Sequence, residues 1–332
     1  MSFASRRRAR KNRYVFVKRP RRWPLGWRST LRVLRLALGI ARGQPGIFPE
    51  PYESVRDWAR RVADKEFEKN LLAPALKGVF AADSSRLSAR LAMGALWSRG
   101  KKGRWKGSVA PSGGMGQLIE ALETHLHKRG VKIHTLPGYV LPRNPDAPVV
   151  LCTSAWDAAG ILRSLQPALA KHLERCESLP LVAVTAFFPR TERDLDGFGC
   201  LFPKLENFTA SGVLFNGSVF SGREEGLRSE TWIFGGDDQP EAVTWSDGET
   251  LTHLLRDRRR LNGQDDEPAH FEVTRWPRAI PCYSVDWERA LDSLKVPAPL
   301  YLHGNYMGAL GLARILDRSR KLAQTIKENY RG

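Results

Sequence analysis

Short apolar runs separated by turn-forming residues occupy the middle of the chain, between Leu195 and Gly236. Three of these runs, Leu201–Phe202, Val213–Phe215 and Trp232–Phe234, alternate with clusters of Gly, Pro, Asn and Ser. This pattern predicts a meander of short strands. Strands rich in Phe and Leu are typical of an ordinary sheet core, and they also form the walls of apolar ligand pockets.

Helical periodicity dominates on either side of this meander. Apolar positions three and four apart predict helices over 27–41, 55–72, 87–97, 115–128, 155–165, 250–261 and 311–329. Short apolar or alternating runs predict strands over 14–17, 131–134, 149–152, 181–188, 272–276 and 300–302. The chain is therefore expected to have a mixed fold of the α+β or α/β class.

The helix expected over 27–41 is amphipathic and basic. One face carries apolar side chains, and arginines lie off that face: Trp27, Leu31, Leu34 and Leu38 on the face, with Arg28, Arg32, Arg35 and Arg42 beside it. Such a helix is suited to a membrane surface. We favour the simpler interpretation that its apolar face packs on the rest of the domain.

Charge is distributed unevenly along the 332 residues, whose formal net charge is +18. The first 35 residues contain 13 Lys and Arg side chains and no carboxylate. A block of this kind is typical of polyanion binding, to nucleic acid or to anionic lipid, although a solvated tail has the same composition. Nucleic acid is the weaker expectation, because the block contains no recognised reading motif.

The cysteines and the longest apolar runs indicate the compartment. The four cysteines are scattered without CxxC spacing: Cys152, Cys176, Cys200 and Cys282. They favour a reducing cytosol over a disulfide framework or a zinc site. No apolar run approaches 18 residues, so no membrane-spanning helix is predicted. We therefore expect a cytoplasmic protein whose attachment to membranes, if any, is peripheral.

Six blocks of the chain, in this order, resemble motifs of one known family. They are ESVRDWARRVADKEFEKNLLAPALKGVFAADSSRLSARLA, PSGGMGQLIEAL, VVLCTSAWDAAGIL, GFGCLFP…GVLFNGSVFSGREEG…WIFGG, RWPRAIPCY and LYLHGNYMGALGLARILDRSRKLA. The family is that of the oxygen-dependent, FAD-containing protoporphyrinogen oxidases of haem biosynthesis, within the flavin amine-oxidase group. The resemblance covers roughly residues 14–330.

The resemblance implies a fold, a division into domains and an activity. It implies a flavin amine-oxidase-like fold with an incomplete FAD-binding domain, an antiparallel-sheet substrate domain and a helical domain. The expected parts are a basic stub at 1–22, the helical domain at 23–105, the substrate domain at 171–290, and FAD-binding parts at 106–170 and 291–332. The implied activity is six-electron oxidation of protoporphyrinogen IX or coproporphyrinogen III by oxygen. Possible further partners are an anionic membrane surface and a second copy of the chain.

Carried over position by position, the resemblance also implies site residues. Leu201 and Phe220 are expected to sandwich the porphyrinogen rings. The expected flavin contacts are Trp276, Gly304, Asn305, Ala309, Leu310 and Gly311. The family's substrate-binding arginine falls near the first predicted strand, where both Arg13 and Lys18 are candidates. No catalytic acid or base is expected, because the cofactor carries the redox chemistry.

The chain departs from the family at its nucleotide-binding unit. The family begins with a βαβ unit whose glycine-rich turn holds the FAD pyrophosphate. No GxGxxG sequence occurs here, and Gly113 to Gly116 is too short a match. Only Tyr139 falls near the adenine-contacting position. The chain thus resembles a truncated member, and the alternative to the oxidase is a non-catalytic relative that binds porphyrin or acts as a scaffold.

Overall fold

The computed structural model describes residues 3–4, 12–97, 110–135, 147–220 and 226–330. Five of the 13 cations of the basic N-terminal block, from Arg6 to Lys11, and Tyr139 lie outside the described residues. The helices are α1 (Trp27–Arg42), α2 (Val55–Val62), α3 (Lys65–Phe67), α4 (Ala73–Phe80), α5 (Ala89–Trp97), α6 (Gly116–Lys128), α7 (Ala155–Leu162), α8 (Pro167–Leu173), α9 (Asn216–Val219), α10 (Asp247–Asn262), α11 (Val285–Ser293) and α12 (Leu312–Asn329). The strands are β1 (Phe3–Ala4), β2 (Arg13–Val17), β3 (Arg19–Arg21), β4 (Ala110–Pro111), β5 (Val149–Leu151), β6 (Ser178–Pro189), β7 (Gly199–Leu201), β8 (Gly212–Leu214), β9 (Leu227–Gly235), β10 (His270–Pro281) and β11 (Leu300–Leu302).

Local sequence accounts for several helix starts. In each case a serine side chain accepts a hydrogen bond from the backbone N–H three residues on: Ser54 for α2, Ser154 for α7, Ser246 for α10 and Ser284 for α11. In the first three, that third residue is Asp or Glu, the arrangement of a capping box. These helices therefore begin where the sequence satisfies the N–H groups that a helix start leaves free.

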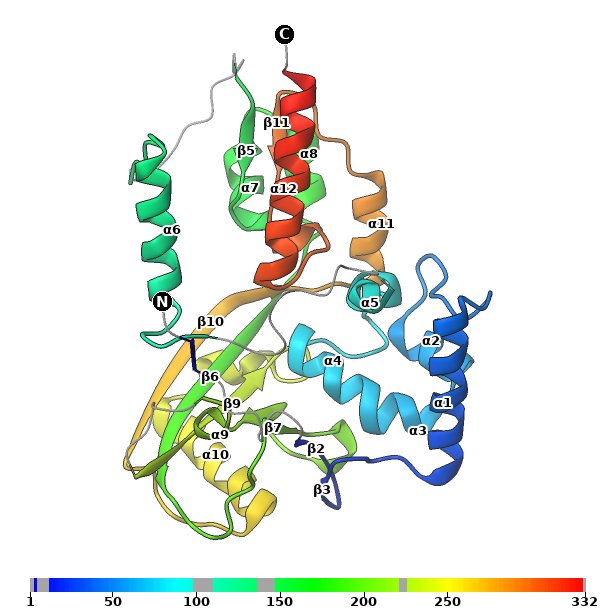
Figure 1. The fold of residues 1–332 in the computed structure, drawn as a ribbon, viewed down its shortest axis with the longest axis vertical. Coiled ribbons are helices and arrows are strands. Elements are labelled where there is room, and N and C mark those ends of the chain that lie inside the picture. The colour runs from blue at the N-terminus through cyan, green and yellow to red at the C-terminus, as the bar shows by residue number, and fades with distance from the viewer. Residues whose placement is uncertain (1–2, 5–11, 98–109, 136–146, 221–225, 331–332) are drawn as a thin grey trace.

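The largest sheet has seven strands in the order β10-β6-β9-β8-β7-β2-β3. The predicted meander is confirmed, since β7, β8 and β9 pair antiparallel in sequence order. Strand β2 joins the sheet through a parallel pairing with β7 and an antiparallel one with β3, so the sheet is mixed. Figure 1 shows α10 against this sheet in the lower part of the molecule.

Helix α10 is fixed to the sheet by buried charge as well as by apolar packing. The guanidinium of Arg258, a residue with no exposed surface, lies 3.7 Å from the centre of the Phe188 ring. The fully buried carboxylate of Asp257 accepts a 2.7 Å hydrogen bond from the Ala210 backbone N–H. A buried charge is costly unless it is paired or hydrogen-bonded, and these contacts supply such partners.

A second, smaller sheet consists of β5 and β11, which pair in parallel. It packs with α7, α8 and α11 in the upper part of the molecule (Figure 1). Its core includes Leu151, Leu162 and Leu302 and continues through the helical region that contains Trp58 and Leu87. Among the described helices, none combines the length and the apolar character needed to cross a bilayer.

Three expectations from the sequence are corrected by the structure. The apolar face of α1 does not pack on the domain, because Trp27 is 74% and Leu34 56% exposed. The helix expected over 55–72 ends at Val62, and Asp64 caps a new helix by accepting a hydrogen bond from the Phe67 N–H. Residues 131–134 form no strand, since this segment has no partner strand among the described residues.

Candidate functional site

An apolar cavity of about 250 Å³ lies between the central sheet and α4. Strand β2 contributes Arg13 and Tyr14, and α4 contributes Gly78 and Val79. The remainder of the wall is Ala75, Phe198, Gly199, Cys200, Leu201, Ser211, Gly212, Val213, Leu214 and Ile233. This apolar cavity therefore opens onto the predicted meander at β7 and β8.

Leu201 and Arg13 are brought together at this cavity. Strand β2 pairs with β7, which sets Val15 opposite Leu201 and Arg13 opposite Gly199. The Arg13 guanidinium lies 4.9 Å from the centre of the Phe198 ring, in a cation–π contact. Lys18 is not part of the lining formed by the described residues, and its backbone N–H donates to Glu206 3.1 Å away. The structure thus distinguishes two cations that the sequence left equivalent.

Phe220 lies outside the lining that the described residues form around the apolar cavity. It follows the short helix α9 and is half-buried. The sequence analysis did not identify Val79 and Leu214, which do line the cavity and are 52% and 39% exposed. Exposed apolar side chains are the available signal for such a wall, and exposure cannot be read from the sequence alone.

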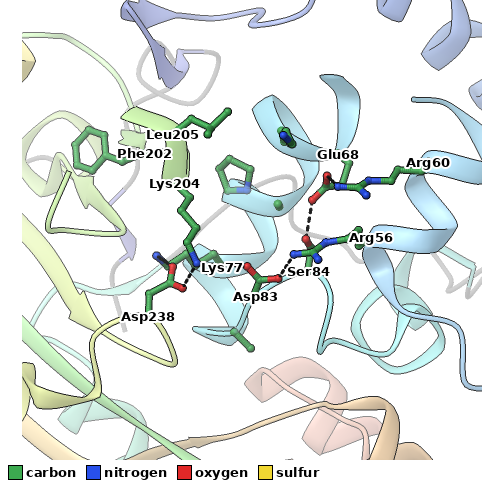
Figure 2. Close-up of a pocket in the computed structure, with 14 residues that line it drawn as sticks. Arg56, Arg60, Glu68, Lys77, Asp83, Ser84, Phe202, Lys204, Leu205 and Asp238 are labelled. Atoms are coloured by element: carbon green, nitrogen blue, oxygen red, sulfur yellow. Dashed lines mark hydrogen bonds and ion pairs between the residues drawn. The ribbon is translucent and has the colours of Figure 1, made fainter. Parts of the chain in front are cut away.

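A polar cavity of about 220 Å³ lies on the other side of α4 (Figure 2). Arg56 pairs with Asp83 at 2.7 Å, and Arg60 pairs with Glu68 at 3.0 Å. Figure 2 also shows the Ser84 hydroxyl donating to the Glu68 carboxylate, at 2.7 Å. Each carboxylate in this lining is paired with a cation. The main role of these residues is therefore to connect the helices to the sheet.

The connection to the sheet is made by two lysines that share one carboxylate. Lys77 of α4 and Lys204 after β7 bind Asp238 at 2.6 and 2.8 Å. Burial raises the pKa of Asp238, but the hydrogen bonds from Lys204 and Lys77 outweigh it and hold the pKa below its ordinary value. Burial of Asp83 is likewise outweighed, chiefly by hydrogen bonds from Ser85, so its pKa is also lowered. Both groups therefore stay ionised at neutral pH.

The expected flavin contacts lie mostly on a glycine-rich turn between β11 and α12. A side chain at Gly304 would meet the Tyr306 ring at 2.7 Å. Gly308 and Gly311 have φ angles of 80° and 93°, which favour glycine. The turn is fixed to the core by the Tyr283 hydroxyl, which donates a hydrogen bond to the Asn305 carbonyl.

The surface of this turn is suited to one end of a flavin. A Cβ atom on Gly311 would meet nothing within 4 Å, so the backbone borders open space. No side chain caps the start of α12, whose first turn contains no acidic residue. The free N–H groups and the helix dipole there favour a partial negative charge. Ala309 is buried beneath the turn and Leu310 is half-buried.

Other expected contacts are placed elsewhere in the fold. Trp276 lies on β10 opposite Leu181 and is 45% exposed. The residues present fit the ring end of a flavin at the 304–311 turn, but no GxGxxG turn exists in the sequence to hold a pyrophosphate. At Gly113 the backbone N–H already donates to the side-chain carbonyl of Gln117, 3.2 Å away.

Comparisons with known proteins agree with this architecture. Protoporphyrinogen oxidase 1 of Arabidopsis thaliana is 27% identical, over 86% of this chain and 64% of its own. Coproporphyrinogen III oxidase of Propionibacterium freudenreichii is 28% identical, over 64% of this chain and 44% of its own. The structure of an engineered putrescine oxidase superposes with a TM-score of 0.75 at 14% identity, covering 98% of this chain and 83% of that one.

The family assignment rests on a match that covers most of the chain. The chain spans 62% to 65% of the length of the plant protoporphyrinogen oxidases that it matches over most of its own length. Residues 2–312 match the family described as flavin containing amine oxidoreductase. The mixed sheet and the glycine turn before α12 are consistent with that match. The chain belongs to the flavin containing amine oxidoreductase family, and within it resembles the protoporphyrinogen and coproporphyrinogen oxidases.

Proposed function

We propose that the chain is part of a flavin-dependent porphyrinogen oxidase that acts on protoporphyrinogen IX or coproporphyrinogen III. The observation that carries the proposal is the apolar cavity in which Leu201 and Arg13 lie together. The named activities of the relatives supply the substrate class. Oxygen is the proposed acceptor, haem biosynthesis is the proposed context, and the five-part division of the chain belongs to the same proposal.

The chemistry of a porphyrinogen matches this cavity. Its rings are flat and apolar, and Leu201, Val79 and Leu214 offer apolar contact. Its propionates require cationic partners, since a carboxylate that leaves water unpaired is costly. Among the described residues of the lining, Arg13 is the one cation. The cavity volume of about 250 Å³ is below the ~300 Å³ of typical ligand sites, so the cavity accepts one part of the macrocycle. Phe220 lies outside the cavity lining, so it contacts the substrate only where the macrocycle extends beyond the cavity.

For the cofactor we propose the ring end of FAD at the 304–311 turn. Gly304, Asn305 and Gly311 line the turn, with Ala309 and Leu310 supporting it from within. Trp276 is proposed as a further contact from β10. A flavin held at this turn would supply the electron acceptor for the oxidation of the substrate. The residues of this chain orient the two partners and exclude water, and none of them is assigned a proton transfer.

The test is reconstitution of the purified chain with FAD. The oxidase proposal expects retained yellow flavin and a porphyrin Soret band that grows when protoporphyrinogen IX or coproporphyrinogen III is added under air. Heat-denatured protein with the same FAD controls for spontaneous oxidation. Porphyrin binding without accelerated oxidation would instead favour the non-catalytic relative. If the chain neither binds porphyrin nor accelerates its formation, the result contradicts both functions.

A second candidate function, binding to an anionic membrane surface, is favoured by α1. Its face carries Trp27, Leu31, Leu34 and Leu38, at 74%, 44%, 56% and 56% exposure. Arg28 and Arg35 lie beside that face and have no ion pair among the described residues. An amphipathic helix of this kind binds a bilayer by burying its apolar face while its cations meet the head groups.

This candidate is tested by flotation with lipid vesicles. Wild-type chain should co-float with phosphatidylserine-containing vesicles and much less with phosphatidylcholine alone, and salt should weaken the binding. Leu34→Asp should abolish flotation. Leu122→Asp, an equally exposed leucine on α6, is the matched control and should leave it intact. Equal losses in both variants would contradict a role for α1.

A further inference from the structure

The polar cavity beside α4 contains more positive than negative charge. Among the described residues, its lining has three carboxylates and five cations: Glu68, Asp83 and Asp238 against Arg56, Arg60, Lys69, Lys77 and Lys204. The lining therefore has two positive charges in excess. Asp237 does not balance them, because its carboxylate accepts a hydrogen bond from the Asp83 backbone N–H at 2.7 Å and pairs with Arg86 at 3.6 Å.

The ion pairs of this cavity satisfy its carboxylates but not all donors of its cations. A guanidinium has five N–H donors, and the side chains of Arg56 and Arg60 each donate through one Nη2 atom. Their Nε atoms are buried and have no hydrogen-bond partner in the described part of the chain. Lys69 forms no ion pair with any described residue. These three cations therefore keep donor capacity for a further anion.

The two remaining cations depend on a single close carboxylate. Lys77 and Lys204 bind Asp238 at 2.6 and 2.8 Å, and Lys204 lies 3.9 Å from its next carboxylate, that of Asp83. Like charges held close together repel each other, and a nearby anion reduces that repulsion. Both lysines therefore also favour an additional anion in the cavity.

The cations of the cavity come from elements on opposite sides of it. Figure 2 shows Arg56 and Arg60 on one side and Lys204 on the other. Lys69 lies on a single π-helical turn, Glu68–Leu72, between α3 and α4. Turns of this kind are uncommon, and many of them lie at functional sites. An anion in the cavity would thus contact cations of α2, of the π-helical turn and of the segment after β7.

The charge and the size of the cavity indicate the class of the ligand. An anion with two negative charges balances the excess, and a phosphate monoester carries about 1.5 to 2 of them at pH 7. The planar fork of a guanidinium matches two phosphate oxygens, and lysine binds phosphate as a point charge. The volume of about 220 Å³ is below the ~300 Å³ of typical ligand sites, so the ligand is small. Leu205, which is 67% exposed in the lining, offers apolar contact to an attached organic group.

We propose that the polar cavity is a binding site for a phosphate dianion, supplied as free phosphate, as a small phosphate monoester or as the head group of an anionic lipid. The phosphate contacts Lys69 and the guanidiniums of Arg56 and Arg60. Because it binds the folded chain, it stabilises the connection between α4 and the sheet. Helix α4 separates this site from the apolar cavity, and the proposal does not depend on the proposed function.

The test uses the full chain in a phosphate-free buffer at constant pH and matched ionic strength. Inorganic phosphate, glycerol 3-phosphate and succinate are titrated by calorimetry, and the Tm is measured at each concentration. We expect the phosphate compounds to bind and to raise the Tm as their concentration rises. Succinate has two charges but no phosphate group, and should bind at least tenfold more weakly. Vesicles with and without phosphatidic acid test the lipid source.

Variants of single cations locate the binding. Lys69→Met should weaken phosphate binding roughly tenfold or more, because it removes one charge-assisted contact. Lys69 has no ion pair to lose among the described residues, so circular dichroism should confirm unchanged folding. Arg60→Lys keeps a cation beside Glu68 but removes the planar fork, and should weaken binding severalfold.

The matched control is Lys65→Met, at an exposed lysine of α3 outside the lining that the described residues form. It should bind phosphate with the affinity of the unmodified chain. Binding of phosphatidic acid vesicles alone, abolished by Lys69→Met, would identify a lipid head group as the ligand. The proposal is overturned if no phosphate compound or phosphatidic acid vesicle binds, if succinate binds as tightly as phosphate, or if Lys69→Met loses no more affinity than Lys65→Met.

Discussion

At the scale of single residues, the alternation of side chains at the end of β7 separates the apolar cavity from the core of the sheet. Leu201 faces the apolar cavity, whereas its neighbour Phe202 is buried and stacks on Phe208 with ring centres 4.0 Å apart. Successive side chains of a strand point to opposite faces, so one strand end serves both a ligand wall and a core. Gly78 permits the close approach of α4, since a Cβ there would lie 3.0 Å from a Leu201 methyl.

The choice between Arg13 and Lys18 yields a prediction at this scale. Arg13→Met should weaken binding of protoporphyrin IX roughly tenfold to a hundredfold, because one charge-assisted hydrogen bond to a propionate is worth about 1.5–3 kcal/mol. Lys18→Met, outside the cavity lining, is the matched control and should bind as the wild type does. Fluorescence titration measures both. A larger effect at Lys18 would show that the substrate lies elsewhere.

At the scale of elements, α4 is the wall between the cavities and is anchored by Lys77 to Asp238. Because the pKa of Asp238 is lowered, its contribution to stability is present above its unfolded-state pKa, near 3.8, and is lost as pH falls through the folded value. Asp238→Asn should therefore lower the free energy of unfolding at pH 7 by about 2 kcal/mol, between the values for exposed and buried pairs. The difference should shrink as pH is lowered from 7 towards 2, because the wild-type carboxyl becomes protonated as pH falls through its folded-state pKa.

Urea denaturation at the two pH values measures this effect. Asp247→Asn is the control. It removes the ion pair between Arg275 and the Asp247 carboxylate, which is 63% exposed, and should change the free energy of unfolding by less than about 0.5 kcal/mol. A deficit in Asp238→Asn that is equally large at acid pH would indicate lost packing instead. The pKa of Asp237 is raised by burial and also by the neighbouring Asp238 charge, so Asp238→Asn should lower the pKa of Asp237 as well.

How far the sequence predicts these elements depends on whether their determinants are local. The serine cap at Ser54 and the turn clusters of the meander are local, and the start of α2 and the order of the meander strands were predicted correctly. The helix expected over 55–72 nevertheless ends at Val62, and the helix expected from Thr250 begins at Asp247, directly after the Ser246 cap. The chemistry of α1 was also visible, but its exposure was not, because burial depends on what packs against the helix. The resemblance indicated Leu201, whereas Val79 comes to the same cavity only through the tertiary placement of α4.

At the scale of the whole molecule, two apolar cores meet at α4. One joins the helices with β5 and β11, and the other lies between the central sheet and α10. Helices α6 and α12 contribute no buried side chain to either core. Segments that bury few side chains open at low free energy, whereas core strands open only with global unfolding. Stability against local opening should therefore differ sharply between α6 and the strands of the central sheet.

Hydrogen exchange should reveal that difference. In the chain alone, amides of α6 and of 131–135 should exchange far faster than those of β6 and β9, which pair with each other over nine residue pairs in the sheet. Helix α10 has the length of α12 but buries Leu254 and Arg258, and it should be the better protected of the two. Slow exchange throughout α6 would contradict this expectation and would mean that its apolar stripe is covered in solution, for example by a second copy of the chain.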